Sequence, residues 1–173
     1  PKDFLQSLDK LKEYGFNIEH ISSSRKYKKT LTFIFGQLLE EFFCRLSNIG
    51  IRPLSVYQFR KKINSAKYIV SLTDGFSISL GFYYCFINKK NKIKLAGGFH
   101  KLSEYDRKLP SILKKVYYQI FYRILKRLDY LIFYGESDRL NSIKNFNINK
   151  DNIFLIKFGV DTNFWIPHKN NYY

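Results

Sequence analysis

Several residue types are scarce in this sequence of 173 residues, which has no methionine, one tryptophan, two cysteines and four prolines. Because even the first position is not methionine, we expect the natural N-terminus to lie upstream of Pro1. The two cysteines, Cys44 and Cys85, lie in apolar helical stretches and have no CxxC spacing. This pattern is typical of reduced, buried thiols in a cytosolic protein.

Long apolar runs and metal-ligand clusters are also missing. The longest apolar run, Phe76–Ile87, is broken by Ser and Gly and is shorter than the ~20 residues of a membrane-spanning helix. The histidines, His20, His100 and His168, have no Cys or His at ligand spacing, so we expect no metal. No signal peptide is visible. The sequence therefore predicts a cytoplasmic protein, soluble or peripheral on the inner face of the membrane.

Acidic residues are few, at 14 against 30 Lys and Arg, which gives a formal net charge of +16. Such a charge favours a polyanionic partner: nucleic acid, anionic lipid or a phosphate-bearing substrate. A compositional bias that raises lysine throughout the chain is the simpler explanation of the charge, because the basic residues are spread along it. Both interpretations stay open. A hydrophobic content of 45%, with 18% aromatic residues, is ample for a core.

Segments with strand and helix patterns alternate along the chain. An amphipathic helix ends at Gly15, and Phe16–Ile21 alternates like a short strand. Further helices are predicted over 31–47, 57–64, 76–87, 110–127 and 137–146, and strands over 67–72, 93–96, 129–134 and 153–157. The alternation predicts a Rossmann-like, three-layer α/β domain with a mostly parallel sheet flanked by helices.

The end of the sequence has the pattern of a domain boundary. The apolar run from Asn152 leads into Gly159-Val-Asp-Thr162, two aromatic residues and Pro167. We expect residues 1–167 to form the domain, with its first strand preceding Pro1, and residues 168–173 to begin a linker to a second domain.

Polar residues and glycines follow two of the predicted strands. Ligands of open α/β sheets bind beyond the carboxyl ends of the strands. Thr73-Asp74-Gly75 follows one strand and Gly97-Gly98-Phe99-His100-Lys101 the next. Paired glycines allow close approach of a ligand and expose backbone amides, while a histidine and a lysine can face an anion or hydroxyl. The alternatives are a tight turn at the glycines, a helix N-cap at Asp74 and an ordinary loop histidine.

Known nucleotide-binding and hydrolase motifs are absent from the sequence, which has no P-loop, no GxGxxG after a strand and no GxSxG.

The predicted helix over 110–127 is basic. Its Lys114, Lys115, Arg123, Lys126 and Arg127 border a Tyr-rich stripe of Tyr117, Tyr118, Phe121 and Tyr122. Such a helix either lies on an anionic bilayer or covers a sheet with its basic face in solvent. Nucleic acid is not expected, because no RNP-like or helix-turn-helix pattern is present.

The order of these residues resembles the N-terminal domain of GT-B glycosyltransferases of the retaining, family 4 group. The matching motifs are Leu128-Asp-Tyr-Leu-Ile-Phe133 and Phe158-Gly-Val-Asp-Thr-Asn-Phe-Trp-Ile-Pro167. Ile93–Lys101 resembles the strand that ends in the active-site histidine of the family. The chain departs from the family pattern at Gly135, where a serine is usual, and at Lys157-Phe158, where Pro-Asn is usual. The chain contains no ExxxxxxxE signature of the family's donor-binding domain, which we expect to follow Tyr173.

This resemblance implies the acceptor-side half of an enzyme that moves a sugar from a nucleotide-sugar to a hydroxyl of a glycan or lipid-linked acceptor, as in cell-envelope polysaccharide synthesis. His100 would be catalytic, and Asp74, Gly75, Gly97, Gly98 and Lys101 would bind the acceptor. No metal or other cofactor is implied. Without the donor domain the chain would be inactive. The alternative is a non-catalytic, basic α/β module that binds an anionic membrane or another polyanion.

Overall fold

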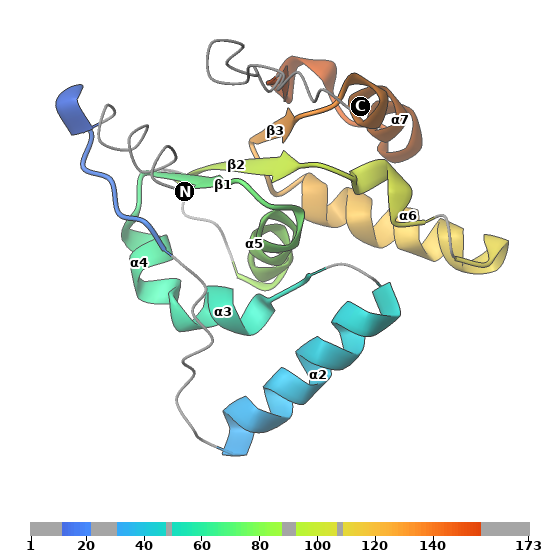
Figure 1. The fold of residues 1–173 in the computed structure, drawn as a ribbon, viewed down its shortest axis with the longest axis horizontal. Coiled ribbons are helices and arrows are strands. Elements are labelled where there is room, and N and C mark those ends of the chain that lie inside the picture. Colours follow the sequence, from blue (N-terminus) through green and yellow to red (C-terminus); the bar gives the residue numbers. More distant parts are fainter. Residues whose placement is uncertain (1–11, 22–30, 48–49, 88–92, 107–108, 157–173) are drawn as a thin grey trace, which may run out of the picture.

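The computed structural model describes residues 12–21, 31–47, 50–87, 93–106 and 109–156 (Figure 1). They contain a four-stranded sheet in the order β1-β2-β3-β4. Its strands are β1 (Tyr68–Ser71), β2 (Lys94–Phe99), β3 (Tyr130–Phe133) and β4 (Ile153–Leu155). All neighbouring strands are parallel. The predicted α/β class with a parallel sheet flanked by helices is therefore confirmed, and the arrangement is Rossmann-like.

Three helices connect successive strands: α5 (Asp74–Phe86), α6 (Ser111–Leu125) and α7 (Glu136–Phe146). Because strand order follows chain order and βαβ crossovers are right-handed, these helices lie on one face of the sheet. The side chains that point to this face are buried, namely Leu95, Phe99, Leu131 and Phe133. On the opposite face several apolar side chains are exposed: Tyr68, Val70, Tyr130 and Phe154.

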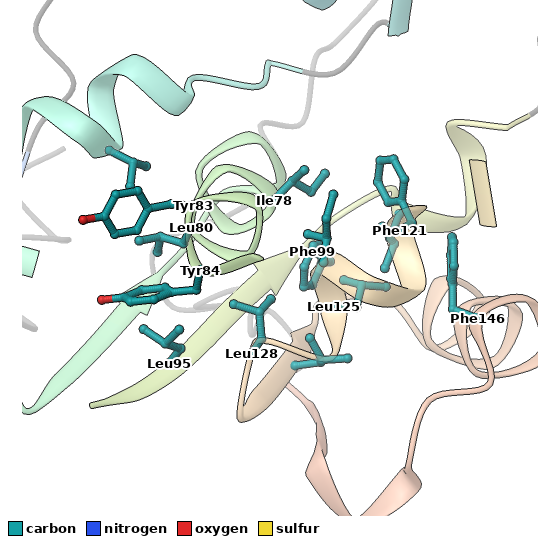
Figure 2. Packing of buried hydrophobic residues seen from close by; sticks show 14 of the residues in the cluster. Ile78, Leu80, Tyr83, Tyr84, Leu95, Phe99, Phe121, Leu125, Leu128 and Phe146 are labelled. Carbon is teal, nitrogen blue, oxygen red and sulfur yellow. The ribbon is translucent and has the colours of Figure 1, made fainter. Parts of the chain in front are cut away.

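The core lies between the sheet and these helices. Figure 2 shows Phe99 on β2 surrounded by Ile78 of α5 and Leu125 of α6. The rings of Phe99 and Phe133 are 5.8 Å apart, and Phe146 of α7 closes the cluster. Removal of this apolar surface from water is the main stabilising contribution to such a fold.

The helices α2 (Leu31–Ser47), α3 (Pro53–Gln58) and α4 (Arg60–Ser65) precede the sheet in the chain. Of these, α3 packs against α5, and α2 packs against α3 (Figure 1). The side-chain amide of Asn64 in α4 donates a hydrogen bond to the hydroxyl of Tyr83 at 3.2 Å and accepts one from the hydroxyl of Tyr84 at 3.3 Å, both in α5. As a result, α5 is covered by protein on its outer side as well.

Three expectations need correction. Phe16–Ile21 is not a strand, since the described residues contain no ladder to it, although Ile21 does pack against the core. The helix expected over 57–64 is two short helices that meet at Phe59. The strand expected over 93–96 continues through both glycines to Phe99, because β3 pairs along that whole length. The motif Gly159–Thr162, the linker over 168–173 and most of the first helix lie outside the described residues.

Candidate functional site

The candidate site lies where β1, β2 and β3 end. Asp74 is the first residue of α5, which is separated from the end of β1 by two residues, and His100 and Lys101 follow β2. Tyr134 follows β3. Parallel strands bring these ends to one edge of the sheet. Asp74 and His100, which the sequence predicted to share a site, do meet there.

The Asp74 carboxylate holds the loop that leaves β2. It is only 7% exposed. Its Oδ1 accepts the backbone N–H of His100 at 2.8 Å, and its Oδ2 accepts the N–H of Lys101 at 3.1 Å and the hydroxyl of Tyr105 at 2.9 Å. These donors compensate the burial of the carboxylate. The N-cap of α5 is Thr73, so the alternative interpretation of Asp74 as the N-cap is wrong.

A second carboxylate holds the same loop from the other side. Asp138, in the first turn of α7, is 9% exposed. Its Oδ2 accepts the N–H of Leu102 at 3.2 Å, and its Oδ1 accepts the N–H of Ser103 at 2.7 Å. The backbone N–H groups of residues 100 to 103 are therefore bound by two buried carboxylates. Each carboxylate also lies near the positive end of a helix dipole.

The imidazole of His100 is exposed, and contacts on two sides define its position. Its Nε2 lies 3.3 Å from the carbonyl oxygen of Leu72, after β1. Its ring stacks on Tyr134, with centroids 4.2 Å apart and planes at 21°. Because a carbonyl oxygen only accepts, the contact with Leu72 requires the proton on Nε2. In the neutral ring Nδ1 is then the acceptor nitrogen.

Gly98 makes room for this stack. A Cβ atom on Gly98 would lie 2.8 Å from the Tyr134 hydroxyl oxygen and 2.9 Å from the carbonyl oxygen of Ser71. Any side chain at this position would therefore displace the ring on which His100 lies. Burial, followed by the charge of Asp74, raises the pKa of Tyr134 above its ordinary value.

The other two predicted glycines are also explained by packing. A Cβ atom on Gly97 would lie 2.8 Å from Leu128 Cδ1, and one on Gly75 would lie 2.0 Å from the carbonyl oxygen of Gly50. Both Gly97 and Gly98 are buried within β2. The expectation that paired glycines leave the strand as a loop with open amides is wrong. Of the predicted residues, His100 and Lys101 are exposed at the sheet edge, with Asp74 buried behind them.

Sequence reasoning missed three contributors to the site: Tyr134, Tyr105 and Asp138. Asp138 carries the same signal as Asp74, an acidic residue in the first helical turn after a strand, and could have been found. The pKa of Tyr105 is raised by burial and then by Asp74, to which its hydroxyl donates. Next to it, Asp106 accepts the hydroxyl of Tyr118 at 2.5 Å, which ties the loop to α6.

This arrangement offers an imidazole of defined orientation next to the exposed Lys101 in the chain. It can bind a hydroxyl-rich or anionic molecule by hydrogen bonds and charge. A cavity of about 270 Å³ lies elsewhere, at the amino-terminal end of the strands. Its lining includes Tyr122, Lys126 and Leu131. It belongs to a different part of the surface.

No known protein family, curated protein or solved structure matches this chain. Among the helices that the structure describes, none is long and apolar enough to cross a membrane.

Proposed function

We propose that the chain is the acceptor-side domain of a retaining glycosyltransferase, with its site at the edge of the sheet formed by His100, Lys101 and Tyr134. The observation that carries the proposal is the position of His100. Its backbone is held by Asp74, and its ring lies between Leu72 and Tyr134 at the end of β2. In the family that the sequence resembles, the active-site histidine lies at the end of the corresponding strand.

In the proposed reaction the bond between the anomeric carbon and the phosphate oxygen of a nucleotide-sugar breaks. A bond from the same carbon to an acceptor hydroxyl oxygen forms, and the hydroxyl proton passes to the departing phosphate. The His100 ring, whose Nε2 is directed at Leu72, offers Nδ1 for a hydrogen bond with the transferred sugar and stabilises charge as it develops. Lys101 attracts the phosphate of a lipid-linked acceptor.

Asp74 acts as a positioning residue. Its carboxylate is buried and occupied by three donors, so it fixes the loop that carries the imidazole. A ring held in place before the substrate arrives loses less freedom in the transition state. Binding of the nucleotide-sugar is assigned to a donor-binding domain of the full protein, as the resemblance implies, and the residues that the structure describes are expected to transfer nothing on their own.

The test is a transfer assay on the full protein encoded by the reading frame. It is incubated with nucleotide-sugars and with glycan or lipid-linked acceptors, and products are detected by mass spectrometry. The expected result is a glycosylated acceptor with the donor's anomeric configuration. A full protein that transfers no sugar from any donor contradicts the proposal.

A further inference from the structure

The outer face of α6 is apolar although the fold does not bury it. Four of its side chains are largely exposed: Ile112 (85%), Leu113 (50%), Val116 (51%) and Ile120 (49%). Their spacing of i, i+1, i+4 and i+8 places them on one face of the helix, which we call the outer stripe. The inner face is already filled by Phe121, Ile124 and Leu125, each at most 6% exposed. The outer stripe is therefore not needed for the core.

The Tyr-rich stripe predicted from the sequence lies mostly on the inner side of α6. Tyr117 and Tyr118 are partly buried and pack against the core. Tyr117 lies 4.1 Å from Phe121, and Tyr118 lies 5.4 Å from Phe146, between ring centroids. The helix thus has two apolar faces. One builds the domain, and the outer stripe remains exposed.

Basic side chains border the outer stripe. They are Lys115, Arg123, Lys126 and Arg127, which are all exposed and which we call the basic border. Residues 107–128 contain no Asp or Glu. The Nζ of Lys126 lies 5.9 Å from the ring centroid of Tyr122, which is itself 40% exposed. Lys114 differs, because its Nζ pairs with Asp106 at 3.3 Å.

We propose that the outer stripe and the basic border of α6 dock the protein on an anionic lipid surface. A lipid interface offers an apolar layer for the stripe and negative head groups for the border in one plane. A nucleic acid would neutralise the border and leave the stripe in water. A second copy of the chain would bring two basic borders together, in a molecule that already carries a net charge of +16.

The docking surface is independent of the glycosyltransferase proposal, because it uses α6 and not the edge of the sheet around His100. A protein that binds lipid through α6 but transfers no sugar would leave the docking inference intact. An enzyme that transfers sugar but does not bind vesicles would leave the transferase proposal intact.

The experiment measures co-sedimentation of the protein with vesicles of phosphatidylcholine alone or mixed with phosphatidylglycerol. We expect binding to the mixed vesicles only, and binding should weaken as salt rises. Replacing two members of the outer stripe, Val116→Gln and Ile120→Gln together, should raise the apparent Kd about tenfold or more. The matched control is Phe35→Gln with Leu38→Gln on α2, where both side chains are 65% exposed. Its affinity should stay unchanged.

A charge-matched pair tests the basic border. Arg123→Gln with Arg127→Gln should weaken binding by about tenfold or more. Lys61→Gln with Lys67→Gln removes the same charge on the α4 side and should have a much smaller effect. Circular dichroism and urea unfolding establish that each variant is folded. Equal losses in both pairs, or equal binding to neutral and anionic vesicles, would overturn the proposal. Binding of an acidic protein, and not of vesicles, to the outer stripe and basic border would overturn it as well.

Discussion

Asp74 and Asp138 occupy corresponding places in the fold, in the first turns of α5 and α7. Both are nearly buried, and each accepts two consecutive backbone N–H groups of the loop after β2. They differ in what else they hold. Asp74 fixes the residue that carries the imidazole and also takes the hydroxyl of Tyr105. Asp138 holds the next two residues, Leu102 and Ser103.

This difference separates the shape of the loop from the orientation of the candidate catalytic group. Both carboxylates give the loop its path, because a buried N–H must find an acceptor. Of the two carboxylates, Asp74 is the one that binds His100. After burial, its charge is also the second cause that raises the pKa of Tyr134, on which the imidazole stacks. We therefore expect Asp138 to matter for stability and Asp74 to matter for stability and for the site.

The largest effect is expected from Asp74→Ala. The substitution removes the acceptor of three hydrogen bonds and leaves their donors unsatisfied. We expect a loss of about 3 kcal/mol or more in the free energy of unfolding, measured by urea denaturation. The His100 ring signals should also shift in the NMR spectrum, because the backbone beneath the ring is released. A loss below about 1 kcal/mol would contradict the role assigned to this carboxylate.

Asp138→Ala should cost about 2 kcal/mol, because two backbone donors lose their acceptor. The contact of His100 with Leu72 and Tyr134 should persist, so its ring signals should move far less than in Asp74→Ala. Since both carboxylates hold one loop, the double variant should lose less than the sum of the single losses. If the loss in the double variant equals the sum of the single losses, the two carboxylates do not stabilise the same loop.

Gly98→Ala should cost about 1–3 kcal/mol, since a methyl group there meets backbone at Ser71 as well as the Tyr134 ring. The stacking of His100 on Tyr134 should be lost, and with it the ring-current shift of the imidazole protons. Gly135→Ala is the matched control, because no atom lies within 4 Å of its Cβ position. An unchanged imidazole spectrum in Gly98→Ala would argue against a spacing role for this glycine.

The smallest effect concerns alkaline pH. The folded protein holds the pKa of Tyr105 above its ordinary value of about 10, first by burial and then by Asp74. The neutral phenol is therefore favoured in the folded state. Its contribution to stability is present below pH ~10 and is lost as pH rises through that value towards the folded pKa. Above this pH the free energy of unfolding should fall less steeply with pH in Tyr105→Phe than in the unsubstituted protein. Equal slopes would contradict the shift.

The sequence was sufficient to predict the parallel sheet and the meeting of Asp74 with His100. Both follow from the alternation of strands and helices, because the carboxyl ends of parallel strands lie at the same edge of a sheet. The stack of His100 on Tyr134 could not be predicted, because it depends on the pairing of Phe99 with Phe133 and on the space above Gly98. A glycine inside a strand and a glycine just after one also look alike in sequence.

The two apolar faces of α6 show another limit. The sequence pattern contains the Tyr-rich stripe and the outer stripe side by side, and periodicity alone does not say which one faces the sheet. Packing decides, because Phe121 and Ile124 fill the space beside the core. The residues of the outer stripe are left outside with the basic border.

The most direct measurement for the proposed site compares two histidines in the full protein. His100 lies at the edge of the sheet, while His20 is exposed in the segment before α2. With unchanged stability in both variants, kcat/KM for sugar transfer should fall about 100-fold or more in His100→Ala. It should remain that of the unsubstituted protein in His20→Ala. Equal kcat/KM for both variants would contradict the assignment of the site to His100.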